Sequence, residues 1–210
     1  WEHNNSKWHL EYRMSTLTVK ELSAPTGEVI KIASGKTLDL NSQGTLILPT
    51  VPSSKMPTGS VLQVKQTVLT TSSAAAIDGW YDITGLSVAI TPTSASSKIL
   101  IKVNVFAAVS NHGWTTGIRI LRGSTVIGIG TSGNNTRNNA AAWVFMSGTN
   151  GEDAAHMPVE YLDSPSTTNA TTYKVQYMGG NTGVTTYINR LPANTAVCSI
   201  STITVQEIQG

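Results

Sequence analysis

The sequence predicts an all-β protein. From Thr26 onward apolar and polar residues alternate with period two, and Gly, Pro, Ser, Asn and Thr bound the alternating runs. This is the pattern of half-buried strands joined by turns. Beyond the first dozen residues, no window shows a 3.6-residue apolar stripe with helix caps. Charged residues make up only 12% of the 210-residue chain, about half the usual fraction, which disfavours long solvated helices.

The first segment, residues 1–13, lacks the layout of a signal peptide. Its aromatic residues Trp1, Trp8 and Tyr12 fall at positions i, i+7 and i+11, which share one face if the segment is helical. Three exposed aromatic rings on a short arm are unfavourable unless another surface covers them. We therefore expect these residues to anchor the chain to a larger particle. A vector-derived or disordered leader is the alternative.

Residues 14–52 contain a short repeat. Apolar pairs recur at a spacing of eight, punctuated by Gly27, Gly35 and Gly44, which indicates a strand and a turn three times over. Each unit presents too few apolar side chains to form its own core, so we expect several chains to intertwine as a homotrimeric β stalk. The residues expected along the trimer seam are Ile30, Ile32, Leu38, Leu40, Leu46 and Leu48. A single edge hairpin packed on the following domain is the alternative.

Residues 53–59 predict a linker, because Pro, Ser and Gly cluster there. Residues 60–210 then show about ten strand candidates separated by turns, which favours a jelly-roll-like β-sandwich knob. The expected strands are 61–70, 81–90, 98–109, 117–121, 125–130, 141–147, 157–163, 171–178, 185–189 and 198–208. The third and the last alternate most strictly, so each has one face for the core and one for solvent. The alanine runs 74–76 and 140–142 are too short for helices.

Charge and cysteine content disfavour several functions. The formal net charge of +2 is spread along the chain, which leaves no basic stripe for nucleic acid. No apolar run reaches eighteen residues, so membrane insertion is not expected. Cys198, the single cysteine, cannot form an intrachain disulfide, and its alternating surroundings predict a buried, inert thiol. The four histidines and their acidic neighbours lack the spacing of zinc or calcium sites, so we expect no metal or cofactor.

No catalytic motif stands out. The segment 130–133 contains a serine but lacks the spacing of a hydrolase elbow. Glu152 with Asp153 or Glu160 is the only local pair of carboxylates suited to glycan cleavage. Solvated acids in loops are far commoner than catalytic pairs, so we expect no enzymatic activity.

Four loops hold the residues best suited to binding, because amides there lie near an aromatic ring or an arginine. Planar amides bond sugar hydroxyls, and an indole offers a stacking face. The receptor-binding candidates are Asn111, His112, Trp114, Asn134, Asn135, Arg137, Asn139 and Asn181. The alternative is ordinary solvated turns in which Asn and Gly adopt left-handed backbone conformations.

A series of short segments suggests a family. In chain order they are SGKTLDL (34–40), MPTGSVLQV (56–64), DITGLSV (82–88), ITPTS (90–94), SSKIL (96–100), LRGS (121–124), YLDSP (161–165), TTYKVQ (171–176), INR (188–190) and a last strand that ends in Glu207 and Ile208. Their order and spacing resemble the terminal domain of tail-fibre and other structural proteins of tailed bacteriophages, cyanophages in particular. The resemblance covers about residues 26–210. It implies a trimeric virion appendage protein with a β-rich knob, of a kind used on tail fibres and on heads.

Together, the residues and the resemblance predict a non-enzymatic virion structural protein. It would be a trimeric phage fibre or head appendage that projects a β-knob for host adhesion. Its expected partners are its own copies, capsid or tail proteins reached through the N-terminal arm, and a glycan or protein of the host surface. We expect it in the virion, after assembly in the host cytoplasm. The alternatives are a capsid decoration (cement) protein without receptor binding and a virion-borne polysaccharide depolymerase.

Overall fold

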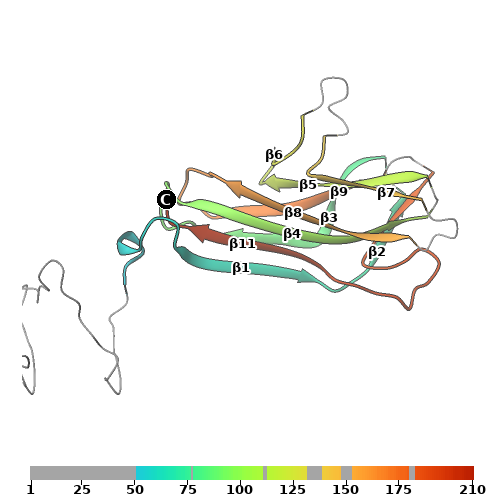
Figure 1. Ribbon diagram of the computed structural model, residues 1–210, viewed down its shortest axis with the longest axis horizontal. Coiled ribbons are helices and arrows are strands. Elements are labelled where there is room, and N and C mark those ends of the chain that lie inside the picture. The colour runs from blue at the N-terminus through green and yellow to red at the C-terminus, as the bar shows by residue number, and fades with distance from the viewer. Residues whose placement is uncertain (1–50, 77, 111–112, 132–138, 148–152, 180–182) are drawn as a thin grey trace, which may run out of the picture. The chain divides into compact units, whose positions relative to one another are not determined.

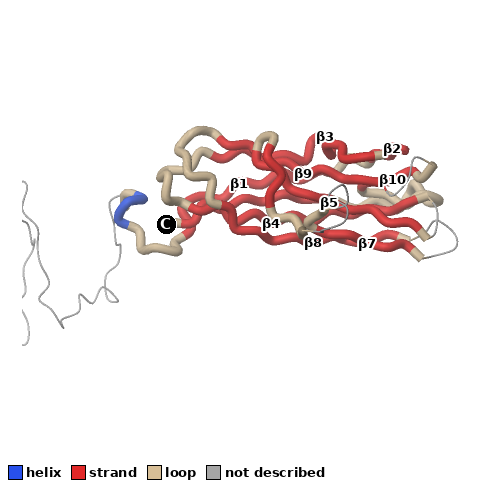
Figure 2. The backbone as a smooth tube through the Cα atoms, turned by 90° about the horizontal axis from the view of Figure 1, so that it is seen from above, coloured by secondary structure: helices blue, strands red, loops and turns tan. Residues whose placement is uncertain are grey.

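The computed structural model describes residues 51–76, 78–110, 113–131, 139–147, 153–179 and 183–210. Within these ranges the chain forms eleven strands and one short 3-10 turn, η1 (Ser53–Lys55), and the strands dominate the backbone (Figure 2). The strands are β1 (Val61–Leu69), β2 (Ser73–Ala76), β3 (Gly79–Ile90), β4 (Lys98–Val109), β5 (Trp114–Arg122), β6 (Thr125–Ile127), β7 (Ala142–Met146), β8 (Ala154–Asp163), β9 (Thr171–Gly179), β10 (Thr185–Ile188) and β11 (Ser201–Ile208). The prediction of an all-β protein is confirmed.

The strands form two antiparallel sheets (Figure 1). Sheet A has the order β1-β11-β4-β10-β2, with β8 on the other side of β4, and sheet B has the order β3-β9-β5-β6, with β7 also paired to β5. The main pairings are β1 with β11, β3 with β9, β4 with β8, and β5 with β6 and β7. Strands near the start of the chain thus pair with strands near its end, and strands closer to the middle of the chain pair with one another. The chain is arranged as one long β-hairpin folded over into two sheets. This is jelly-roll order, and the predicted jelly-roll-like sandwich is confirmed.

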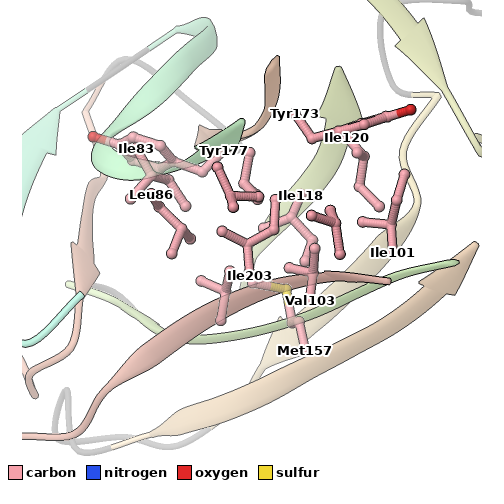
Figure 3. Close-up of a cluster of buried hydrophobic side chains, with 14 of the residues drawn as sticks. Ile83, Leu86, Ile101, Val103, Ile118, Ile120, Met157, Tyr173, Tyr177 and Ile203 are labelled. Carbon is pink, nitrogen blue, oxygen red and sulfur yellow. The ribbon is translucent and has the colours of Figure 1, made fainter. Parts of the chain in front are cut away.

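The core lies between the inner faces of the two sheets (Figure 3). In β11 every second residue is buried, beginning with Ser201 and continuing through Ile203 and Val205 to Glu207. Odd-numbered residues of β4 from Ile99 to Val105 are buried in the same way. Because successive side chains of a strand point to opposite faces, this burial follows directly from the alternation in the sequence.

A wide bulge in β3 decides which of its side chains face outward. Asp82 pairs with Gln176 and Ser87 pairs with Lys174, so four residues of β3 lie opposite one residue of β9. Gly85, with φ +87°, supplies the left-handed backbone that the bulge needs. Both large apolar residues within the bulge, 83 and 86, are buried. As a result even-numbered residues face outward before the bulge, and odd-numbered residues face outward after it.

Asn189 connects neighbouring strands through hydrogen bonds at the point where the partner of β4 changes from β10 to β11. β10 pairs with β4 as far as Ala107 and β11 pairs with β4 only up to Asn104, so the intervening backbone of Phe106 needs other partners. The backbone N–H of Asn189 donates to the Phe106 carbonyl at 3.0 Å, and the backbone N–H of Phe106 donates to Ser201 Oγ at 3.1 Å. Ser201 Oγ in turn donates to Asn189 Oδ1 at 2.7 Å. These contacts close the gap in the ladder.

An ion pair between a partly exposed arginine and a buried aspartate links the two sheets. Arg122 of β5 donates from one Nη to both oxygens of Asp163 of β8, at 2.9 and 3.0 Å. The Tyr173 hydroxyl of β9 donates to the same carboxylate at 2.7 Å. Burial, together with this bond to Asp163, raises the pKa of Tyr173 far above its usual range, so the phenol stays protonated and remains a donor.

Apart from shifts of up to three residues at strand ends, two details differ from the sequence-based expectation. Ser73–Ala76, which covers an alanine run, is a strand because it pairs with β10, although its small side chains carry no alternation of size. The prediction of a buried thiol at Cys198 is wrong. The last strand begins at Ser201, and Cys198 is exposed in the preceding segment, where an isolated bridge joins it to Arg190.

Candidate functional site

The outer face of sheet B carries two tryptophans in one cross-strand row. Trp80 of β3 pairs with Met178 of β9, Met178 pairs with Gly117 of β5, and Gly117 pairs with Trp143 of β7. Paired residues share a face of the sheet, and the neighbouring residues Tyr177 and Ile118 belong to the core. The row therefore faces outward. The two indole rings converge across it, with centroids 6.0 Å apart and planes tilted by 59°.

Gly117 gives Trp143 a place to lie flat against the sheet. A Cβ added to Gly117 would lie 2.7, 2.7 and 2.9 Å from three fused-ring atoms of Trp143. Because these distances are nearly equal, the indole meets the strand with its face. Met178 points outward by register, yet it is only 3% exposed, which is consistent with a cover formed by the two indoles. Trp143 itself keeps 37% of its surface exposed.

Beside the tryptophans lies an ordered chain of polar side chains. Lys174 Nζ donates to Asp82 Oδ2 at 2.7 Å, and Gln176 Nε2 donates to Asp82 Oδ1 at 2.7 Å. Arg119 Nε donates to Gln176 Oε1 at 2.8 Å. The Arg119 guanidinium also lies 4.5 Å from the ring centroid of Trp80, within the range of a cation–π interaction. These contacts fix the position of the Arg119 side chain beside the aromatic pair.

The electrostatics of this face leave one positive charge without a full counter-charge. The hydrogen bond from Lys174 holds the pKa of Asp82 below its usual value; partial burial opposes this effect, and the bond from Gln176 adds to it. Burial lowers the pKa of Arg119, which nevertheless remains a cation. Asp82 and Lys174 form a close ion pair, so the charge of Arg119 is the one that remains. Within the described part of the chain, neither Nη of Arg119 donates a hydrogen bond.

Few of the receptor-binding residues predicted from the sequence fall within the described ranges. Trp114 does, and it packs on its strand's inner side against a small cluster formed by Val109, Met146 and Val184. Asn139 is half-buried beside the described end of its loop. The remaining predicted residues lie outside the described residues: Asn111, His112, Asn134, Asn135, Arg137 and Asn181 for the receptor, Trp1, Trp8 and Tyr12 for the anchor, and Ile30, Ile32, Leu38, Leu40, Leu46 and Leu48 for the seam.

Other chemistry is sparse in the described part of the chain. No group of three or more His, Cys, Asp and Glu residues there could hold a metal ion. Glu160, one of the carboxylates considered for glycan cleavage, lies on the outer face of sheet A and pairs with Lys102 at 3.2 Å. No helix among the described residues has the length and apolar character needed to cross a membrane.

The sequence-based reasoning missed Trp80 and Trp143 for identifiable reasons. Residues 142–146 are all apolar, so alternation could not say which side chains face outward. At Trp80 the bulge of β3 reverses the phase that the later residues of the strand suggest. One signal was available. A five-residue strand with aromatic residues only at its second and fourth positions, here Trp143 and Phe145, must place both rings on the same face.

The described residues define a jelly-roll β-sandwich with an aromatic and hydrogen-bonding outer face on one sheet. No family model matches the chain, and no curated protein matches it.

Among solved structures, the chain is similar to particles of infectious bursal disease virus. Virus-derived T=1 particles align with a TM-score of 0.38 and 13% identity, over 77% of this chain and 41% of theirs. The Gx strain aligns with a TM-score of 0.33 and 14% identity over 77% and 41%, and the VP2 subviral particle with 0.33 and 15% over 77% and 42%. This chain thus spans less than half the length of those chains. At this level the likeness carries no argument about function.

Proposed function

We propose that this chain is a non-enzymatic structural protein of a virus particle, a fibre or head appendage of a tailed bacteriophage whose knob adheres to the host surface. The observation that carries the proposal is the jelly-roll order of the strands combined with the placement of the phage-like segments. The segment 82–88 spans the bulge of β3, 121–124 forms the turn from β5 to β6, and 161–165 ends β8. Jelly rolls recur in viral capsid proteins and in lectins. Because fold alone does not define function, the adhesive role depends on the surface.

Assembly as a homotrimer belongs to the same proposal. Residues 14–52 would form the intertwined stalk, residues 1–13 would bind other capsid or tail proteins, and the protein would act in the virion after assembly in the host cytoplasm. Three binding sites held at a fixed separation gain apparent affinity without any new contact. This gain supports a trimer for a protein whose single sites bind weakly.

The second candidate is a capsid decoration protein without receptor binding. It is favoured by the outer face of sheet A, where Val64, Val68 and Leu162 are 52%, 44% and 47% exposed. Apolar side chains at this exposure suit contact with another protein.

The mass of the intact chain in solution tests the assembly. Light scattering should give three times the 22.2 kDa chain mass. A second measurement on a chain that starts at Ser53 shows whether the knob or the stalk holds the trimer together. A monomeric intact chain would contradict both the stalk and the avidity argument.

Binding assays separate the two candidate functions. An adhesion knob should bind saturably to a panel of cyanobacterial strains, chosen because of the resemblance to cyanophage proteins. A decoration protein should instead bind virus particles that lack it, with little binding to cells. Release of reducing ends from host capsule would contradict the non-enzymatic role.

A further inference from the structure

We propose that Arg190, which lies over the Tyr187 ring on the outer face of sheet A, binds the carboxylate or sulfate group of an acidic saccharide. This inference rests on the proposed function of host adhesion. It names the class of ligand and assigns the contact to residues of the described part of the knob.

Tyr187 lies in a cross-strand row on the outer face of sheet A. It belongs to β10 and pairs with Ala74 of β2 on one side and with Ala108 of β4 on the other. Its neighbours in the strand, Thr186 and Ile188, are both 0% exposed, so the tyrosine side chain points away from the core. The sandwich therefore carries this ring on its outside, between two small side chains.

The residues that follow Tyr187 hold Arg190 in place. Ile188 belongs to the core, and the buried Asn189 side chain makes three hydrogen bonds that fix the backbone leading to Arg190. An isolated bridge pairs Arg190 with Cys198. The guanidinium carbon lies 4.5 Å from the centroid of the Tyr187 ring, within the range of a cation–π interaction. Little side-chain freedom is therefore lost when Arg190 binds a ligand.

The positive charge of Arg190 has no counter-charge within the described part of the chain. No ion pair and no side-chain hydrogen bond joins Arg190 to another described residue. In contrast, Arg122 is paired with Asp163, and Arg119 lies near the charge of Asp82. The guanidinium N–H groups of Arg190 thus remain available. Because they form a planar fork, they match two oxygens of a carboxylate or of a tetrahedral oxyanion such as sulfate.

A carboxylate of a second knob is the competing source of such oxygens. Each carboxylate side chain in the described part of the chain already has an interaction partner, which applies to Asp78, Asp82, Asp153, Glu160, Asp163 and Glu207. A second knob would have to give up one of these interactions to reach Arg190. The Tyr187 hydroxyl makes no hydrogen bond to a described residue, and it can both donate and accept. An acidic saccharide supplies an oxyanion for Arg190 and hydroxyls for Tyr187.

The site lies at the end of the sandwich away from the point where the chain enters it. Lys98, at the start of β4, pairs with Ile208 beside the entering strand β1, whereas Ala108 pairs with Tyr187. Ten residues of β4 separate Lys98 from Ala108, which corresponds to about 34 Å. Figure 2 shows β2 and β10 at one end of the sandwich and the C-terminus at the other. A knob tethered ahead of β1 therefore presents this site at its outer end.

The test uses the intact chain with oligogalacturonates as the carboxylate probe, dextran sulfate fragments as the sulfate probe and neutral dextran oligosaccharides. Intact cyanobacterial cells form a further arm. Arg190→Gln removes the charge and the fork, Arg190→Lys keeps the charge and loses the fork, and Tyr187→Leu removes the supporting ring. The matched control, Lys98→Gln, removes an exposed positive charge from the other end of the same sheet. Circular dichroism and thermal melting show whether each variant remains folded.

We expect the wild type to bind at least one acidic probe saturably and to bind neutral dextran about tenfold more weakly or less. Arg190→Gln should weaken binding of the acidic probe by about tenfold or more, because a charge-assisted hydrogen bond is lost. Arg190→Lys and Tyr187→Leu should weaken it by several-fold, and Lys98→Gln should bind like the wild type. The acidic probe that binds more tightly identifies the preferred oxyanion.

For cells, we expect Arg190→Gln to bind more weakly than Lys98→Gln. Binding of the wild type should be lost after periodate oxidation of surface glycans and should survive protease treatment. Added salt should weaken it, since the contact is between opposite charges near the surface.

Several results would overturn the inference, and they separate it from the proposed function. Equal binding of neutral and acidic probes would show that no oxyanion is recognised, and equal losses in Arg190→Gln and Lys98→Gln would reduce the effect to general charge. Cell binding that is unchanged in Arg190→Gln would leave adhesion intact and place the site elsewhere. Cell binding that is lost on protease treatment and survives periodate would identify a protein receptor. Absence of binding both to the oligosaccharides and to cells would overturn the inference and the adhesive function together.

Discussion

Replacement of Asn189 should destabilise the knob more than any other single amide substitution among the described residues. Its side chain is fully buried and makes three hydrogen bonds. Nδ2 donates to the carbonyls of Leu69 at 2.8 Å and Thr71 at 3.0 Å, and Oδ1 accepts from Ser201 at 2.7 Å. Alanine would leave these buried groups without their partner.

The expected loss for Asn189→Ala is about 3–5 kcal/mol of unfolding free energy. Each lost bond contributes about 1 kcal/mol, or more where a buried group stays unsatisfied. Asn189 also has φ +60°, a left-handed conformation that costs alanine about 1 kcal/mol. Asn189→Asp keeps the shape of the side chain but points a carboxylate oxygen at two carbonyl oxygens. It should therefore be unstable at neutral pH and partly recover in acid, when the protonated carboxyl can donate.

Denaturant unfolding at fixed protein concentration measures these changes, because the stability of an oligomer depends on concentration. The control is Asn169→Ala. Asn169 is exposed, and only its backbone takes part in the hydrogen bonds described for it. The control should stay within about 0.5 kcal/mol of the wild type. If Asn189→Ala were as stable as the control, the argument that Asn189 closes the gap in the ladder would be refuted.

Three further substitutions test other parts of the sandwich. Glu207 is fully buried; burial raises its pKa, but hydrogen bonds from neighbouring side chains outweigh this and hold the pKa below its ordinary value of 4.5. Its contribution to stability is therefore present above pH 4.5 and is lost as the pH falls through the lowered pKa. Glu207→Gln should therefore weaken the fall of the melting temperature at acid pH. A melting temperature that falls in acid as steeply as that of the wild type would contradict this. Gly128→Ala should cost about 2–4 kcal/mol in denaturant unfolding, because φ is +60° and the new Cβ would lie 2.8 Å from the Tyr161 ring. A neutral result would contradict both the backbone strain and the clash with Tyr161. Arg122→Met should cost about 2–4 kcal/mol in the same assay by leaving Asp163 buried without its cation, and a stable variant would show that the ion pair contributes little.

The sequence predicted the strands well where one face of a sheet is buried along its whole length. The bounds of β4 match the expected 98–109 at both ends, because strict alternation marks each inward side chain. β2 was missed, since its residues are mostly alanine and only pairing with β10 makes it a strand. Cys198 was misplaced because residues 198–208 read as one continuous strand in the sequence, whereas the backbone joins the ladder only at Ser201.

The candidate site was harder to predict, because it depends on three strands that are distant in the sequence. Trp80 and Trp143 meet only through the register of β3, β9, β5 and β7. Gly117 in β5 gives no local sign that an indole from another strand lies on it. The binding residues that the sequence did suggest, such as Asn134 and Asn181, remain predictions.

The pairing of β1 with β11 also determines how the knob responds to mechanical load. Gly59 N–H donates to the Gln209 carbonyl and Gln209 N–H donates to the Ser60 carbonyl, both at 2.8 Å, so the ladder begins where the chain enters the sandwich. After a shift of register between Val61 and Gln63, it continues to the pair Leu69 and Ser201. Tension along β1 would strain these hydrogen bonds together, in shear, whereas tension across the sheet would open them one after another. A knob tethered ahead of β1 should therefore withstand a lengthwise pull better than a sideways one.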